Sequence, residues 1–418
     1  MSKTYKLKYG KACFHVDLPS KLGKAENLTI KEPEFCLIRE QFTKDFSLCM
    51  PKRLSSCHAA SFAVSIVVAD KTRLCDYTTY LPWVVEILQK INIQKHQIKF
   101  FVAYGTHKEQ SYAECLSAYG DIYQNYEFIH HDSSDKNLFT YLGRTERGTK
   151  IHVRKDILES DLIITFGALS HHYFAGYGGG RKLLFPGLGY KPDIYQNHGL
   201  FLDKKMKKLA HGCKPGNLDN NPLAHDLKQI DDTVKIPRIS IHGILDSKAR
   251  VCQLVVGKSY NDFLNACNTL DSCYKARKKN QYDLVIASCG GFPKDINFIQ
   301  AHKAINNAAM FVKDKGSLII TAQCPDGIGS DTFLEYFEFQ NFDQAFSVLE
   351  DNYQGNGGTA LSMMEKTGRI NIFIKTDLDD KVCKKIGMRK IDTSMIQTML
   401  NEFQGDIACV DNASLLVV

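Results

Sequence analysis

The chain has 418 residues, 24% of them charged and 44% hydrophobic, which is the composition of a globular protein long enough for two domains. No apolar run approaches the ~18 residues of a membrane span and no signal peptide is recognised, so we expect a cytoplasmic protein with reduced cysteines and no membrane partner. The net charge of +7 is dispersed, and its one cluster, Lys204 to Lys208, is typical of a solvated surface rather than a nucleic-acid site.

The first half of the sequence alternates apolar runs that predict strands with segments that predict helices. Such alternation is typical of an α/β fold with a parallel sheet. Strands are predicted over residues 61–69, 98–103, 126–129 and 162–166, and helices over 82–88, with Pro82 in the first turn, and 111–118. Residues 201–250 predict loops around short elements, and a strand over 249–256 and a helix over 259–279 follow.

Polar side chains follow three of the predicted strands. Asp70 and Arg73 come directly after the first strand, His107 lies in a Gly-Thr-His-Lys turn after the second, and His172 follows the strand 162–166. In parallel sheets, ligands bind beyond the carboxyl ends of the strands. Three strand ends that carry reactive groups therefore predict a functional site at this edge of the sheet.

The stretch 170–198 carries the densest chemistry of the sequence. The glycines Gly178–Gly180 allow close approach of a ligand to the backbone, and the cations Arg181 and Lys182 follow at once. This combination predicts a phosphate site, although neither a Walker A loop nor a dinucleotide fingerprint is present. From these residues alone, Lys182 is either a phosphate-binding cation or the attachment point of a cofactor.

A second α/β unit is predicted after residue 275. Strands over 282–287 and 317–322 flank a helix over 297–312, which carries Gln300 and Lys303 three residues apart on one face. Strands over 370–374 and 407–410 complete a small sheet. We therefore expect two α/β domains with parallel-type sheets, 1–275 and 276–418.

Five motifs, taken in order, resemble the nickel-dependent lactate racemase family. They are Asp70-Lys71-Thr72-Arg73, Gly105-Thr106-His107-Lys108, the segment His172 to Gly187, His198, and the segment Ser288 to Ala304. The resemblance implies an isomerase that racemises or epimerises a 2-hydroxy acid, lactate or a larger relative, in a cleft between its two domains. It also implies a nickel-pincer nucleotide cofactor, the nickel complex of pyridinium-3,5-bisthiocarboxylic acid mononucleotide, and cofactor-maturation enzymes as partners.

The resemblance assigns one group of residues to the cofactor. Lys182 would tether it, and His198 would be the one protein ligand of the nickel ion, whose other ligands come from the pincer. This resolves a difficulty, because one histidine without cysteine or carboxylate partners does not hold a metal tightly. The residues that would hold the nucleotide phosphate are Gly178, Gly179, Gly180 and Arg181.

The remaining matched residues would act on the substrate. His107 and His172 would take and return the hydroxyl proton, one for each orientation of the substrate, while a hydride passes to the pyridinium ring and back. An unperturbed imidazole pKa of ~6.5 suits both tasks. Arg73 and Lys303 would hold the substrate carboxylate, and Asp70 and Gln300 would orient the histidines or the substrate.

Two hypotheses of other classes stay open at this stage. A zinc hydrolase would use His171, His172 and His198, but the sequence lacks the spacing typical of zinc ligands. A non-enzymatic binder of a phosphorylated small molecule would need only the glycines and cations near residue 180.

Overall fold

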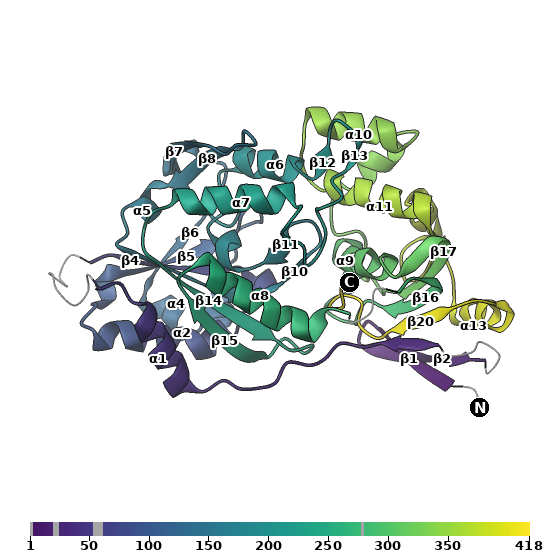
Figure 1. Cartoon of the computed structure of the whole chain (residues 1–418), viewed down its shortest axis with the longest axis horizontal. Helices are drawn as coiled ribbons and strands as arrows, with labels where there is room; N and C mark the ends of the chain where they lie inside the picture. Colours follow the sequence, from purple (N-terminus) through teal and green to yellow (C-terminus); the bar gives the residue numbers. More distant parts are fainter. Residues whose placement is uncertain (1–2, 20–24, 53–61, 277–279) are drawn as a thin grey trace. The chain divides into compact units, whose positions relative to one another are not determined.

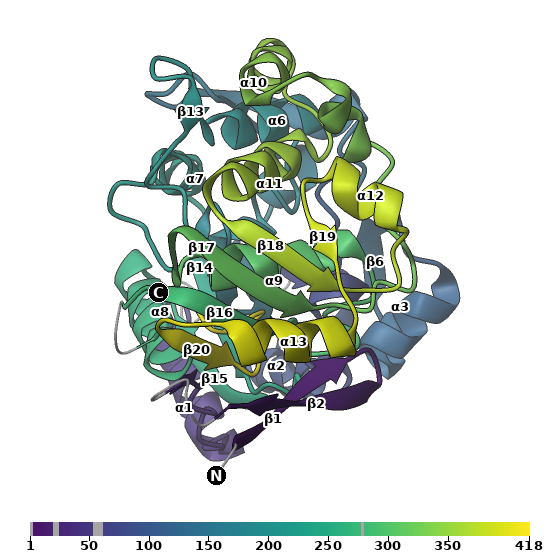
Figure 2. The same ribbon diagram turned by 90° about the vertical axis from the view of Figure 1, so that its right-hand side faces the viewer.

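The computed structural model of the chain describes residues 3–19, 25–52, 62–276 and 280–418 (Figures 1 and 2). The chain divides into two compact units that interleave along the sequence. Unit 1 consists of Met1–Lys31, Gly199–Gly216 and Tyr274–Val418, and unit 2 of Glu32–His198 and Asn217–Cys273. The predicted boundary at residue 275 lies next to the last passage between the units, whereas the two earlier segments of unit 1 fall inside the predicted domain 1–275.

Unit 2 is built on a six-stranded sheet in which every neighbouring pair is parallel except β14 and β15. Helices lie on both sides of this sheet (Figure 1), which explains why its central strands are mostly apolar and buried on both faces. All six residues of β4 are buried. The strands, in spatial order, are β15 (Val251–Gly257), β14 (Arg238–Leu245), β9 (Leu162–Ala168), β4 (Val64–Ala69), β5 (Ile98–Ala103) and β6 (Glu127–His130).

The helices of unit 2 confirm the predicted α/β alternation with two differences. Pro82 lies inside α2 rather than in its first turn, because buried Tyr77, Tyr80 and Leu81 extend the helix toward the N-terminus. The expected helix 259–279 ends earlier, and residues 277–279, like residue 61 of the first expected strand, lie outside the described residues. The helices are α1 (Arg39–Cys49), α2 (Tyr77–Lys90), α3 (Tyr112–Tyr119), α4 (Asp121–Asn125), α5 (Lys155–Leu158), α6 (Lys191–Gly199), α7 (Pro222–Thr233) and α8 (Tyr260–Tyr274).

The region 201–250 contains more regular structure than the sequence predicts. It includes α7, which begins with Pro222 after the capping side chain of Asn221, and β14, which pairs with β9 inside the sheet. β14 reads Arg-Ile-Ser-Ile-His-Gly-Ile-Leu, so polar residues interrupt the apolar run by which buried strands are recognised. The prediction of loops was therefore wrong for these two elements.

Unit 1 contains a second six-stranded sheet, and all of its neighbouring strands are parallel. The predicted α/β class with parallel sheets is thus confirmed for both units. The strand of this sheet that comes first along the sequence lies near the N-terminus, and it pairs with the strand that comes last along the sequence. The strands, in spatial order, are β19 (Arg389–Lys390), β18 (Asn371–Lys375), β17 (Val312–Thr321), β16 (Tyr282–Ser288), β20 (Ile407–Val410) and β3 (Glu26–Leu28).

The two faces of this sheet are covered by different elements (Figure 2). The antiparallel hairpin of β1 (Lys3–Tyr9) and β2 (Ala12–Leu18) packs with α13 (Thr393–Glu402) around one apolar cluster. The elements on or beside the other face are α9 (Phe298–Ala309), α10 (Phe342–Asp351), α11 (Gly357–Arg369) and α12 (Asp380–Lys385). Among the described residues, no helix combines the length and the apolar character needed to cross a membrane.

Candidate active site

An aspartate and a histidine form a close pair at the carboxyl edge of the unit 2 sheet. Asp70 follows β4 directly, and its Oδ2 lies 2.5 Å from Nδ1 of His107, which follows β5. The other oxygen, Oδ1, accepts hydrogen bonds from the backbone N–H and the hydroxyl of Thr72, at 2.9 and 2.6 Å. Only 3% of Asp70 is exposed, whereas 44% of the His107 side chain reaches solvent. The pair therefore presents its imidazole outward from a buried carboxylate.

The environment keeps Asp70 ionised. Burial raises the pKa of the Asp70 carboxyl, but the hydrogen bond and charge of His107, the hydroxyl of Thr72 and the charge of Arg73 outweigh it and lower the pKa below its usual value. A carboxylate behind an imidazole holds the ring in one orientation and stabilises its protonated form. This geometry suits the orienting role expected for Asp70.

Three residues that the sequence analysis missed hold this pair in place. The side-chain oxygen of Gln110 accepts the backbone N–H of Lys71 at 2.8 Å, which ties the loop after β5 to the loop after β4. The backbone N–H of Gln110 donates to the hydroxyl of Tyr104, which in turn bonds His130 Nδ1 at 2.8 Å. No local sequence pattern marks these residues, because their roles depend on contacts between separate strands.

His172 lies on a small antiparallel hairpin of β10 (Ser170–His172) and β11 (Gly176–Gly178), directly after β9. Neighbouring residues of a strand point to opposite faces, and the two histidines divide accordingly. His171 Nε2 lies 2.8 Å from a carboxylate oxygen of Asp271 on α8. Nδ1 of His172 instead accepts the backbone N–H groups of Phe174 and Ala175, at 3.4 and 3.2 Å.

The ring of Phe174 lies next to three of the expected site residues. The sequence analysis did not single out this phenylalanine. Its centroid lies 4.5 Å from the His172 ring, 5.2 Å from the His198 ring and 5.8 Å from the Lys182 ammonium nitrogen. These three side chains therefore surround one aromatic ring. The structure brings the expected base, tether and metal ligand together in unit 2.

Lys182 and His198 are both partly buried, and both have strongly depressed pKa values. Burial lowers the pKa of Lys182 well below its usual value, and the charges of Arg73 and Arg181 lower it further. Burial, with the charge of Lys182, also lowers the pKa of His198 to about 3. The Nδ1–H of His198 donates to the carbonyl of Ile194 at 2.7 Å, so Nε2 carries the ring's lone pair. A deprotonated amine is a nucleophile, and a neutral imidazole is a metal donor.

The glycines near residue 180 make room for the protein's own atoms. Gly179 and Gly180 have positive φ angles of 78° and 54°. A Cβ atom on Gly179 would lie 2.5 Å from the carbonyl oxygen of Ala168, and one on Gly180 would lie 2.9 Å from the His242 ring. The glycines thus allow the turn after β11 to pack tightly on the sheet.

Arg181 is buried in an unusual environment for a guanidinium. It lies over the rings of Phe263 and Tyr260, with centroid distances of 5.0 and 5.6 Å, and donates to the Tyr260 hydroxyl at 3.1 Å. Its Nε and Nη2 atoms are buried without a hydrogen-bond partner among the described residues. Such orphaned donors are costly, and an anion is the partner that a guanidinium prefers.

The two remaining expected residues lie on unit 1. Gln300 and Lys303 lie near the start of α9, whose first turn is capped by the side chain of Asn297. The Lys303 ammonium donates to the Gln300 side-chain oxygen at 2.7 Å. Their spacing on one helix face, as predicted, allows them to act together.

The glycine-rich segment after β16 has a structural task within unit 1. A carboxylate oxygen of Asp295 accepts the backbone N–H groups of Gly10, at the hairpin tip, and Gln323, at 2.8 and 3.1 Å. The hydroxyl of Ser288 donates to the carbonyl of Lys8 at 2.9 Å. The tip of the β1–β2 hairpin therefore packs against this loop.

The described residues offer no ready metal site made of side chains alone. Among them, no three His, Cys, Asp or Glu side chains gather as a ligand set. His171 is turned toward Asp271 and the Nδ1 of His172 toward its own turn, so the histidines named for a zinc hydrolase do not converge. The donor chemistry instead matches a single imidazole ligand.

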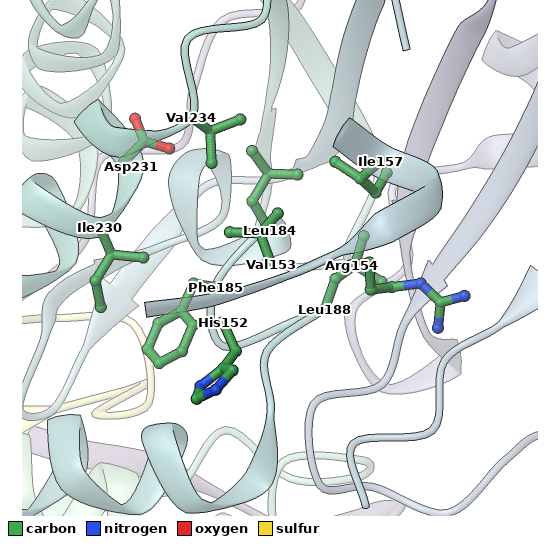
Figure 3. Close-up of a pocket in the computed structure, with 10 residues that line it drawn as sticks. All are labelled: His152, Val153, Arg154, Ile157, Leu184, Phe185, Leu188, Ile230, Asp231 and Val234. Atoms are coloured by element: carbon green, nitrogen blue, oxygen red, sulfur yellow. The ribbon is translucent and has the colours of Figure 1, made fainter. Parts of the chain in front are cut away.

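A small cavity lies elsewhere in unit 2 (Figure 3). Its volume of about 20 Å³ has room for roughly one water molecule. None of the expected site residues lines it. The lining residues are His152, Val153, Arg154, Ile157, Leu184, Phe185, Leu188, Ile230, Asp231 and Val234.

A carboxylate–imidazole pair, an amine of depressed pKa and a neutral imidazole lie together in one α/β unit, an arrangement that suits an α/β enzyme. The profile of the lactate racemase N-terminal domain matches residues 9–210, and that of the lactate racemase C-terminal domain matches residues 277–358. The chain belongs to the lactate racemase family and is an isomerase of the racemase type.

Individual relatives agree with this assignment. The lactate racemase of Thermoanaerobacterium thermosaccharolyticum is 27% identical over 337 residues, which cover 79% of this chain and 76% of the relative. That of Lactiplantibacillus plantarum is 28% identical over 307 residues, covering 71% and 69%. The structure of the T. thermosaccharolyticum lactate racemase apoprotein matches with a TM-score of 0.88 at 24% identity, over 100% of both chains. A Thermotoga maritima protein matches with a TM-score of 0.64 at 15% identity, over 93% of this chain and 99% of that one. These structural matches confirm the fold.

Proposed function

We propose that this chain racemises a 2-hydroxy acid, lactate or a larger relative, with the aid of a nickel-pincer nucleotide. The observation that carries the proposal is the placement of the Asp70–His107 pair, His172, Lys182 and His198 in one unit, at the carboxyl edge of its sheet. Family membership supports the reaction type, and the relatives, which are lactate racemases, support lactate as the first substrate to test.

The residues present fit the proposed cofactor. A Lys182 amine of depressed pKa suits covalent attachment, and His198 offers one neutral nitrogen donor to nickel. Arg181 has two buried nitrogen atoms, Nε and Nη2, that lack hydrogen-bond partners among the described residues, which suits an anionic phosphate group. When bound, the cofactor would supply a reversible acceptor for the hydride of the substrate carbon.

The protein's own part of the reaction is proton handling and orientation. His107 would accept the hydroxyl proton at Nε2 while Asp70 stabilises the resulting imidazolium. His172 would serve the substrate in its other orientation. Arg73 would hold the substrate carboxylate, as a guanidinium does through two parallel hydrogen bonds. Lys303, with Gln300, is proposed to bind the same carboxylate.

The test is to produce the chain together with cofactor-synthesis enzymes and to measure its intact mass, its nickel content and its racemase activity. We expect a mass adduct on Lys182, stoichiometric nickel, and interconversion of the enantiomers of lactate or another 2-hydroxy acid. The variant Lys182→Arg should lose the adduct and all activity, whereas Lys191→Arg, on the exposed start of α6, should keep both.

Two outcomes would contradict the proposal. One is a protein that carries neither adduct nor nickel after maturation. The other is a loaded protein that turns over none of a panel of 2-hydroxy acids, because such a result would favour a binder of phosphorylated ligands. Stoichiometric zinc in the unmodified protein would instead favour a hydrolase.

A further inference from the structure

The hydrogen bonds of His107 determine which of its ring nitrogens carries the proton. Nδ1 lies 2.5 Å from an oxygen of Asp70, and the pKa of that carboxyl is lowered despite its burial. An ionised carboxylate only accepts hydrogen bonds, so Nδ1 must be the donor. In the neutral ring Nε2 then holds the lone pair. His107 therefore rests with a basic nitrogen at its partly exposed end.

The hydrogen bonds of His172 determine the opposite arrangement. Its Nδ1 faces two backbone N–H groups, those of Phe174 and Ala175, which can only donate. Nδ1 must therefore be the acceptor, and the proton of the neutral ring lies on Nε2. The side chain in this way closes its own turn, as an aspartate or asparagine does when it accepts N–H groups two and three residues on.

We infer that His107 and His172 rest in opposite tautomers, His107 as a base and His172 as a hydrogen-bond donor. The assignment rests on the partner atoms: a carboxylate in one case and two amides in the other. It concerns the protein without substrate, and so it stands independently of which hydroxy acid is bound. Its consequence for catalysis rests on the proposed function.

That consequence follows from the proton positions. His107 can take a hydroxyl proton from the substrate oxygen onto Nε2 at once, because its Nδ1–H already faces a carboxylate. His172 cannot do so in its resting state, since Nε2 is occupied and a proton on Nδ1 would face two N–H groups. To act as a base it must first release the amides of Phe174 and Ala175. Opening of the turn between β10 and β11 therefore precedes each proton transfer to His172.

The first experiment is long-range proton–nitrogen correlation NMR on the full-length protein with ¹⁵N-labelled histidine, at about pH 8, above the ordinary imidazole pKa of ~6.5. The unprotonated nitrogen resonates far downfield of the protonated one, so the two tautomers differ in pattern. We expect the unprotonated nitrogen to be Nε2 in His107 and Nδ1 in His172. The variants His107→Gln and His172→Gln assign the signals. The same tautomer for both rings would overturn the inference.

An Asp70→Asn variant gives an internal control for this measurement. An amide can donate as well as accept, so the constraint on His107 should be lost and its pattern should shift toward the other tautomer. The His172 pattern should not move. An unchanged His107 pattern in this variant would show that Asp70 does not set the tautomer, which contradicts the inference.

A second measurement tests the turn without NMR. Asparagine can accept the same two N–H groups through its side-chain oxygen, whereas alanine cannot. We expect His172→Asn to keep the melting temperature within experimental error of the unchanged protein and His172→Ala to lower it by about 2 °C or more. Equal melting temperatures for the two variants would contradict the role of His172 as a turn acceptor. Absence of racemase activity would contradict the proposed function but leave the NMR and melting results intact.

Discussion

The two units of this protein carry the same kind of sheet, yet the carboxyl edges of those sheets are used differently. Each edge has a glycine-containing loop directly after a buried parallel strand. In unit 2 that edge presents His107 and, through the hairpin after β9, His172. In unit 1 the loop after β16 binds the tip of the protein's own hairpin through Asp295 and Ser288. A glycine-rich loop at a strand end is therefore not by itself a ligand site.

The difference lies in the partners of the buried polar groups. In unit 1 the buried carboxylate of Asp295 accepts two backbone N–H groups, so its hydrogen bonds hold the fold together. In unit 2 the buried carboxylate of Asp70 supports an imidazole that reaches solvent, and two buried nitrogens of Arg181 find no hydrogen-bond partner in the part of the chain that the structure describes. Changes at the first edge should therefore reduce stability, and changes at the second should reduce activity.

The largest effect is expected from the histidines of unit 2. A positioned general base contributes about 10²–10⁴-fold to the rate, so His107→Ala and His172→Ala should each reduce racemisation by roughly this factor. Chiral chromatography of the product measures it in the matured protein. The matched control is His96→Ala, at the amino end of β5 on the opposite edge of the same sheet. A similar loss of activity in this control would show that the activity does not depend specifically on the carboxyl edge of the sheet.

Acid should weaken unit 2 through its buried histidines. Burial lowers the pKa of His242 to about 4, against ~6.5 in the unfolded chain, so the unfolded state binds more protons between these values. The free energy of unfolding should then fall as the pH is lowered from 6.5 to 4, by roughly 3 kcal/mol from this residue. Urea titrations at pH 7 and pH 4.5 test this. His242→Gln should make the pH dependence shallower; an unchanged slope would contradict the assignment.

A smaller effect on stability, with little effect on chemistry, is expected from Asp295→Ala in unit 1. The change leaves the backbone N–H groups of Gly10 and Gln323 without their acceptor, which should cost about 2 kcal/mol or more in the free energy of unfolding. Urea denaturation measures the loss. Asp326→Ala, a change at an exposed aspartate three residues after Gln323, should alter stability by less than about 0.5 kcal/mol. Loss of the Lys182 adduct in the Asp295→Ala variant would contradict the proposal that the unit 1 edge serves stability and the unit 2 edge serves activity.

The smallest effect on stability is expected at a glycine where the structure leaves room for a side chain. A Cβ on Gly368, in the last turns of α11, would meet no atom within 4 Å, and its φ is not positive. Gly368→Ala should therefore raise the free energy of unfolding by about 0.5–1 kcal/mol. Gly179→Ala provides the contrast, since its Cβ would lie 2.5 Å from a carbonyl oxygen at a φ of 78°. Equal effects of the two changes would show that the glycine turn of unit 2 is not constrained.

Much of the fold could be predicted because its strands are apolar on both faces. The strands at Ile98–Ala103 and Ile407–Val410 have the predicted bounds, and β4 and β9 differ by only a few residues at their ends. β14 escaped prediction because Ser240 and His242 interrupt its apolar run, although both strand faces are largely covered. Buried polar residues of this kind are stabilised by tertiary contacts that no local pattern records.

The residues of the candidate site likewise fall into two groups, those that could be predicted from the sequence and those that could not. His107 and Asp70 could be predicted as neighbours because adjacent parallel strands bring their carboxyl ends together. Phe174, Gln110 and Tyr104 could not, because each acts through contacts that depend on loops from different strands. The roles expected for Gln300 and Lys303 remain predictions that rest on the family resemblance.

The pairing of β3 with β20 has a consequence for the synthesis of the protein. β3 (Glu26–Leu28) is synthesised long before its partner β20 (Ile407–Val410). At synthesis rates of about 5–20 residues per second, the early strand waits roughly 20–80 s for its partner. During that time the nascent N-terminus is exposed to chaperones and proteases. Truncation of even the last dozen residues would leave this strand without its partner.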